Sequence, residues 1–183
     1  MGKTPRISTD EYLAGPEYPF RRELLFGILR EPPSALRNHQ DVVMHVSTLL
    51  ALYVWKHKLG QVYGSPLDVI LDRPRALVLQ PDVMYISNER RDILGRWIHG
   101  APDIAIEVES RGNRRYDRVQ KLKWYREYGV IEYWLVDPDA ETVTVIDLSG
   151  EKIKRRVFLR SETLASAVLP GYKPQVYEFF SPA

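Results

Sequence analysis

The segment DIAIEVE, residues 103–109, alternates strictly between apolar residues and charged or small ones. Ile104, Ile106 and Val108 share one face of an extended segment, and Glu107 and Glu109 lie on the other, because successive strand side chains point to opposite sides. The pattern predicts a half-buried β-strand with two carboxylates about 7 Å apart on its second face. That face is either the solvated side of an edge strand or the carrier of a chemical site.

Segments on both sides of this strand alternate between helical and extended periodicity. Apolar residues recur at intervals of three and four from residue 38 to Gly60, which predicts an amphipathic helix. Residues 115–128 predict a second long helix that ends at Gly129. Strands are predicted at 22–30, 61–71, 76–86, 131–136, 142–148 and 152–159, and a short helix before Gly15. The order indicates the α/β class, a mixed α+β fold with a central mixed sheet flanked by helices.

Length and composition restrict the classes of protein that need to be considered. At 183 residues, the chain is expected to form a single domain over residues 1–183. Hydrophobic residues make up 44% and charged residues 27%, which excludes intrinsic disorder as the main description. There is no cysteine, so disulfides, thiolate metal sites and a cysteine nucleophile are excluded. No apolar run approaches the length of a membrane span, and we expect a cytoplasmic protein with no membrane partner.

The basic residues are concentrated in one stretch of a nearly neutral chain. The net charge is only +2. Residues 111–126 carry one acid, Asp117, against seven bases, which are Arg111, Arg114, Arg115, Arg118, Lys121, Lys123 and Arg126. Such a strip is typical either of a surface that follows phosphates or of an ordinary solvated helix face.

Further acids occur at positions that suggest a shared site. Asp82 follows Pro81 at the start of a predicted strand, and Glu23 opens the first strand. Asp117 and Lys121 are four residues apart, so they share one helix face. Taken singly, these are a turn residue, a polar surface residue and a surface ion pair. Several carboxylates with a lysine indicate hard-cation chemistry, because Mg²⁺ binds carboxylate and phosphate oxygens.

Four segments together resemble a known family. They are PDV at 81–83, APDIAIEVES at 101–110, DRVQK at 117–121 and YREYGVIEYWLVDP at 125–138. RELLFGILREPP at 22–33 also fits. The chain is similar to the Uma-two family of restriction-like endonucleases, in the PD-(D/E)XK nuclease superfamily. The resemblance implies a restriction-endonuclease-like core and a phosphodiesterase site that depends on Mg²⁺ or Mn²⁺.

The resemblance also implies a role for individual residues. Asp82 matches the metal-binding aspartate and Glu107 the second acid, and Val108 would offer a backbone carbonyl to the metal. Lys121 matches a lysine that this family carries on the helix after the strand. Asp117 would hold that lysine, and Glu23 matches an acid on the first core element.

The chain departs from the family pattern beside these residues. Glu109 stands where the family usually has an aliphatic residue, and Arg111 stands where it usually has proline. Three consequences of Glu109 are open: it adds a ligand for the metal, it pairs with Lys121 or an arginine, or its charge weakens the metal site.

The leading hypothesis is a Mg²⁺-dependent DNA endonuclease with Asp82, Glu107 and Lys121 as catalytic residues. DNA would contact Arg111, Arg114, Arg115 and Arg118 through its phosphates, and cutting both strands favours a homodimer. The alternative is a catalytically weakened nuclease fold that binds nucleic acid or a protein. A third hypothesis is hydrolysis of a small phosphoester.

Overall fold

Strand β7 (Ile104–Val108) is an interior strand of the larger of two sheets in the computed structural model, which describes residues 5–16, 20–110 and 112–181. Within those residues, this sheet has the order β10-β9-β8-β7-β6-β3. β7 runs parallel to β8 and antiparallel to β6, and the other pairs are antiparallel. The bounds are β3 (Gly60–Gly64), β6 (Val83–Ser87), β8 (Glu132–Asp137), β9 (Thr142–Asp147) and β10 (Lys154–Phe158). The mixed sheet confirms the predicted fold class.

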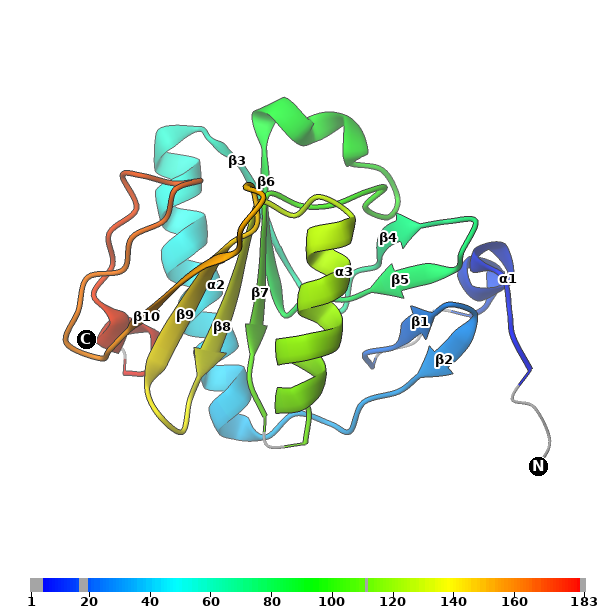
Figure 1. The fold of residues 1–183 in the computed structure, drawn as a ribbon, viewed down its shortest axis with the longest axis horizontal. Helices are drawn as coiled ribbons and strands as arrows, with labels where there is room; N and C mark the ends of the chain where they lie inside the picture. The colour runs from blue at the N-terminus through cyan, green and yellow to red at the C-terminus, as the bar shows by residue number, and fades with distance from the viewer. Residues whose placement is uncertain (1–4, 17–19, 111, 182–183) are drawn as a thin grey trace.

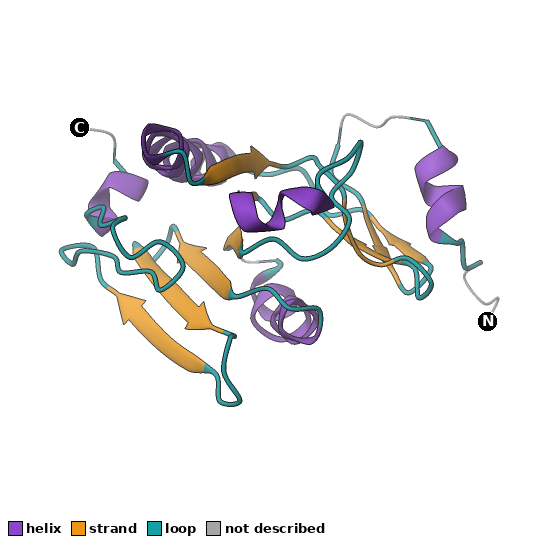
Figure 2. Cartoon of the chain, turned by 90° about the horizontal axis from the view of Figure 1, so that it is seen from above, coloured by secondary structure: helices purple, strands orange, loops and turns teal. Residues whose placement is uncertain are grey.

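Both faces of β7 are covered, which corrects the prediction of a half-buried strand. Ile104, Ile106 and Val108 pack with the apolar face of helix α2 (Arg37–His57). On the other face, Ala105 packs with helix α3 (Leu122–Glu127). Figures 1 and 2 show the two helices on opposite sides of the sheet. The alternation therefore separates a purely apolar face from one that carries buried acids.

A smaller second sheet lies beside the first and was not predicted. Its order within the described chain is β2-β1-β5-β4. The predicted strands 61–71 and 76–86 each divide between the sheets, giving β4 (Val69–Asp72) and β5 (Leu77–Leu79) to this one. β1 (Glu23–Leu25) and β2 (Ile28–Arg30) form a hairpin across Phe26 and Gly27. Both loop residues have positive φ, 52° and 85°, as a tight hairpin turn requires.

The predicted helix at 115–128 contains two kinds of turn. Residues Tyr116–Lys121 form a π-helical segment, η2, and α3 follows without a break. The helix ends before Gly129, whose φ of 90° fits the predicted termination. Asp117 and Lys121 are buried within η2, facing β7 rather than solvent. Short π segments are often found at functional sites.

Side-chain hydrogen bonds stabilise the segments near both ends of the described chain. Helix α1 (Thr9–Ala14) has Ser8 as its N-cap. At the C-terminal end, the buried carboxylate of Glu132 accepts hydrogen bonds from Trp134 Nε1, Ser166 Oγ and the Ala167 N–H at 2.9, 2.7 and 2.5 Å. This anchors the segment that leads to the 3₁₀-helix η3 (Val176–Phe179) beside α2.

A further 3₁₀-helix, η1 (Asn88–Ile93), follows β6. No helix in the described ranges is both long and apolar enough to cross a membrane.

Packing of α2 on the sheet gives a direct test of this core. Leu50 is fully buried on α2, whereas Leu52 on the same helix is 59% exposed. We expect Leu50→Ala to lower the free energy of unfolding by about 2–5 kcal/mol through lost burial and an unfilled cavity. Leu52→Ala, the matched control, should change it by no more than about 0.5 kcal/mol. Urea unfolding followed by tryptophan fluorescence measures both, and equal losses would contradict this packing.

Candidate active site

Glu107 is the centre of a buried polar cluster on the α3 side of the sheet. Its Oε1 accepts hydrogen bonds from Lys121 Nζ at 2.6 Å and from Tyr125 Oη at 2.9 Å. Its Oε2 accepts one from Arg21 Nη2 at 2.8 Å. Because β7 carries Glu107 and the helical segment carries Lys121 and Tyr125, the strand and the helix meet through this carboxylate.

Asp82 lies next to Glu107 at the start of β6. Its Oδ2 accepts the backbone N–H of Val108 at 2.8 Å and lies 3.5 Å from His39 Nε2. Its Oδ1 accepts a hydrogen bond from Arg21 Nη1 at 2.6 Å. Asp82 and Glu107 are thus joined by one guanidinium group. The metal-binding role of the Val108 carbonyl stays a prediction.

Glu23 brings the smaller sheet into the same cluster. Its Oε1 lies 2.9 Å from Lys121 Nζ, so the ammonium group is held between Glu23 and Glu107. Its Oε2 accepts hydrogen bonds from Tyr116 Oη at 3.0 Å and Arg30 Nη1 at 3.1 Å. Asp117 Oδ1 is 3.9 Å from the same Nζ. The structure therefore brings Lys121 to three of the predicted acids, and its side chain is only 1% exposed.

Burial and mutual charge set the protonation of these groups. Burial raises the pKa of Asp117 from 3.8 to about 7, with a further contribution from the charge of Glu107. Burial also raises the pKa of Glu107, against the opposing effect of Lys121 and Arg21. For Glu23 the charges of Lys121 and Arg21 outweigh burial and hold the pKa at about 2. The acids facing Lys121 outweigh burial in turn and raise its pKa, which keeps the ammonium group charged.

Glu109 shares the strand face of Glu107, as predicted, and pairs with an arginine. Its carboxylate accepts two hydrogen bonds from Arg118, at 2.5 and 2.6 Å. Arg114 Nε is 3.5 Å away, and Arg114 Nη2 binds both carboxylate oxygens of Asp137 at 3.0 Å. Two arginines of the basic strip therefore face acids of the protein itself.

The remaining strip residues differ in their surroundings. Arg115 is exposed, whereas Lys121 is buried in the cluster around Glu107. Arg111 lies outside the described residues. Of the described arginines expected to contact DNA, Arg115 and Arg118 are both exposed, and Arg118 is the one of these two that pairs with Glu109.

Arg21 and Tyr125 were not among the candidate site residues of the sequence. Arg21 precedes Glu23 by two residues, so an extension of the β1 alternation would have placed both on one face. Tyr125 follows Lys121 by four residues, which places them on one helix face. His39, near the start of α2, also lies at the site, with its Nε2 3.5 Å from Asp82 Oδ2.

A divalent cation fits the chemistry of these donors, but the Arg21 guanidinium already binds the same carboxylate oxygens. Asp82 and Glu107 offer the hard carboxylate oxygens that Mg²⁺ prefers, and Mg²⁺ commonly uses only one or two carboxylates with water and phosphate. Across the described ranges, no group of three or more histidine or acidic residues forms a ready metal cage. The Arg21 guanidinium lies between the two acids. A cation fits here if it takes the place of that group.

A large groove opens onto this cluster from outside. It has a volume of about 780 Å³, and Arg21, His39, Asp82, Glu109 and Asn113 are among its lining residues. Pro32 to Leu36, the link between β2 and α2, forms another part of its wall. The volume is in the range of sites that hold small organic ligands. Asp82 and Glu109 are therefore reachable from this groove, and Glu107 lies buried behind them.

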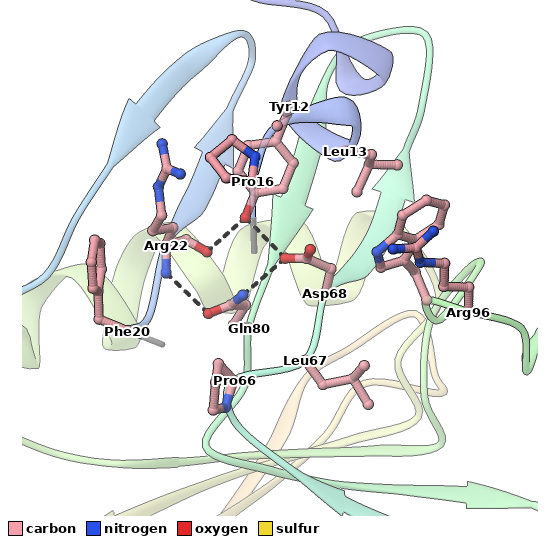
Figure 3. Close-up of a pocket in the computed structure, with 12 residues that line it drawn as sticks. Tyr12, Leu13, Pro16, Phe20, Arg22, Pro66, Leu67, Asp68, Gln80 and Arg96 are labelled. Atoms are coloured by element: carbon pink, nitrogen blue, oxygen red, sulfur yellow. Dashed lines mark hydrogen bonds between the residues drawn. The ribbon is translucent and has the colours of Figure 1, made fainter. Parts of the chain in front are cut away.

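A smaller cavity of about 340 Å³ lies on the α1 side of the second sheet (Figure 3). Asp68 Oδ1 accepts hydrogen bonds from Tyr12 Oη and Gln80 Nε2, both at 2.9 Å. Gln80 Oε1 accepts the backbone N–H of Arg22 at 3.0 Å. These bonds fix the chain next to Arg21, so the network positions the main chain that carries the guanidinium.

Comparisons with known proteins agree with this architecture. One similar solved structure is of "a putative nuclease belonging to DUF820 from Anabaena variabilis ATCC 29413". It shares 18% sequence identity with a TM-score of 0.79, over 95% of this chain and 97% of that one. At this identity the likeness shows the fold. None of the curated proteins compared matches the chain.

A family model decides the relationship inferred from the sequence. The model described as "Uma2: Putative restriction endonuclease" matches residues 9–176. The match extends from the first residue of α1 to the first residue of η3, and so includes every element around Glu107. The chain therefore belongs to the Uma2 family.

Proposed function

We propose that this protein is a divalent-cation-dependent endonuclease that hydrolyses phosphodiester bonds in DNA. The observation that carries the proposal is the meeting of Asp82, Glu107 and Lys121, with Asp82 lining a groove of about 780 Å³. The description of the Uma2 family supports nuclease activity, and Mg²⁺ or Mn²⁺ as the cofactor is part of the proposal.

Each residue has a distinct task in the proposed reaction. Asp82 and Glu107, with the Val108 carbonyl, would hold the cation. Such a cation supplies activation of water and neutralisation of charge at phosphorus. Lys121 is fixed by Glu107 and Glu23 and is 1% exposed, so its ammonium group would act from behind Glu107, by holding that carboxylate and balancing charge. Tyr125 holds Glu107 in position from the same helix.

DNA contact is proposed through the phosphate backbone beside the groove. Arg115 and Arg118 are exposed, and Arg114 and Arg118 would engage DNA only by sharing their charge with Asp137 and Glu109. A homodimer would place two such sites on the two strands of a duplex.

One observation favours the alternative of a binding module without catalysis. Arg21 forms ion pairs with both Asp82 and Glu107 and so neutralises their charge from within the chain. A protein that had lost catalysis could keep this arrangement as a purely structural ion-pair network, with the groove serving only to bind.

Cleavage assays separate the two functions. We expect the protein to cut plasmid, duplex or single-stranded DNA with Mg²⁺ or Mn²⁺ and not with EDTA. Glu107→Gln should lower the rate at least about 100-fold, because the charge facing Lys121 and the cation is lost. Glu89→Gln, on the exposed surface of η1, is the control and should cut normally. Retained DNA binding without cleavage by the parent protein would favour the binding module, and cleavage of a small phosphodiester alone would favour the third hypothesis.

The salt dependence of DNA affinity tests the basic strip. Arg115→Gln should weaken binding and reduce the slope of log affinity against log salt by about 1, since one phosphate contact is lost. Arg118→Gln should reduce the slope less, because Glu109 already neutralises that guanidinium. Arg155→Gln on β10 is the control. Fluorescence anisotropy at several salt concentrations gives the slopes, and an unchanged slope for Arg115→Gln would identify a solvated face.

The raised pKa of Asp117 predicts a pH-dependent contribution to stability. Between pH values of about 4 and about 7, the folded state keeps a proton that the unfolded state has lost. The contribution of Asp117 to the free energy of unfolding therefore falls as the pH rises through this window.

Asp117→Asn removes this group, so the variant should gain stability relative to the parent from about pH 4 to about pH 7 and then level off. Asp147→Asn is the control, because the hydrogen bonds from Ser149 lower the pKa of Asp147 and place its titration below about pH 4, so its stability difference from the parent should stay constant over this range. Urea unfolding across this pH range measures both differences. A constant difference for Asp117→Asn would mean that Asp117 is ionised throughout.

A further inference from the structure

The two terminal nitrogens of Arg21 bind Asp82 and Glu107 at the same time. Nη1 is 2.6 Å from Asp82 and Nη2 is 2.8 Å from Glu107, and Nη2 is also 3.6 Å from Glu23. Lys121 binds the other carboxylate oxygen of Glu107 and does not lie between Glu107 and Asp82. Positive charge between Asp82 and Glu107 is therefore supplied, within the described chain, chiefly by one guanidinium group.

The site needs a cation between these acids. Two buried carboxylates that face each other repel strongly, and removal of one partner from a buried ion pair leaves an uncompensated charge. His39 Nε2 lies 3.5 Å from Asp82 Oδ2, so this ring contacts Asp82 and does not bridge the two acids. A divalent cation and the Arg21 guanidinium would therefore compete for the same oxygens.

The surroundings of Arg21 would also allow its side chain to move away from the two acids. It precedes β1 and belongs to no strand or helix, and its side chain is 20% exposed and lines the large groove. Its Nε is buried without a hydrogen-bond partner among the described residues, so the guanidinium is not fully satisfied where it lies. A phosphate group in the groove could take a two-pronged hydrogen bond from the same guanidinium, a geometry that arginine favours.

We propose that Arg21 occupies the cation position between Asp82 and Glu107 in the free protein, and that a phosphodiester entering the groove draws it away. The inference rests on the proposed function and adds a coupling between its two ligands. Because the exchange is reciprocal, DNA raises the affinity for the divalent cation and the cation raises the affinity for DNA. The acids stay neutralised throughout, so the empty site binds the cation weakly.

The test is calorimetric titration of Mn²⁺ into the metal-free protein. Arg21→Gln removes the competing charge, so it should bind Mn²⁺ about tenfold more tightly than the parent, or more. Arg21→Lys keeps a positive charge but cannot bridge two carboxylates, so its affinity should fall between the two. Arg22→Gln is the matched control, because the Arg22 side chain pairs with Glu31 away from the acids, and its Mn²⁺ affinity should equal that of the parent.

A second titration adds a DNA duplex with phosphorothioate linkages, which resist hydrolysis. In the parent, the duplex should raise the Mn²⁺ affinity by a similar factor, and in Arg21→Gln it should raise it little. Thermal unfolding gives an independent readout, in which Mn²⁺ should stabilise Arg21→Gln more than the parent. If Arg21→Gln does not fold without Mn²⁺, the comparison of Arg21→Lys with the parent decides.

Equal or weaker Mn²⁺ binding by both Arg21 variants would overturn the inference. If the parent nevertheless cuts DNA with Mg²⁺, the inference fails alone and the proposed function stands. If neither the parent nor the variants bind Mn²⁺, with or without the duplex, both fail together.

Discussion

The carboxylate of Glu107 is buried at the centre of the larger sheet, and the surrounding structure is arranged so that it can remain there. Its two oxygens are shared among Lys121, Tyr125 and Arg21. A buried charge of this kind is costly unless it is paired and hydrogen-bonded. The helical segment after β7 brings Lys121 and Tyr125 to it, and the chain before β1 brings Arg21. The two sheets are therefore joined by charge as well as by apolar contact, through Lys121 and Glu23.

Much of this arrangement could be predicted from local patterns and family motifs. The alternation in 103–109 correctly placed Glu107 and Glu109 on one face, and the helical period correctly paired Asp117 with Lys121. The motifs also selected Asp82. What the alternation could not give was burial of the acidic face, because that depends on α3 and the second sheet, which are distant in sequence. Strand periodicity records only which side chains share a face and says nothing about what covers it.

Arg21 escaped prediction for a related reason. Its partners Asp82 and Glu107 are 61 and 86 residues away, and the alternation that places it on the face of Glu23 does not reveal them. Contacts between residues so far apart in sequence depend on how the whole chain folds from one sheet to the other. The same holds for Arg114 and Arg118, whose charges looked available in the sequence. In the fold they face Glu109 and Asp137, so a run of like charges was a poor guide to the charge that a ligand would meet.

The π-helical segment η2 has a consequence for the spacing of residues along the chain. An α-helix advances by about 100° per residue, so one additional residue in a wider turn changes the phase of everything that follows. In this protein the change of phase lets Asp117 and Lys121 face β7 while Leu122, Trp124 and Tyr125 still pack into the core. The length of this segment is thus as constrained as its chemistry. Relatives that conserve the cluster should tolerate substitutions at exposed positions of η2, such as Val119, far better than a deletion of one residue.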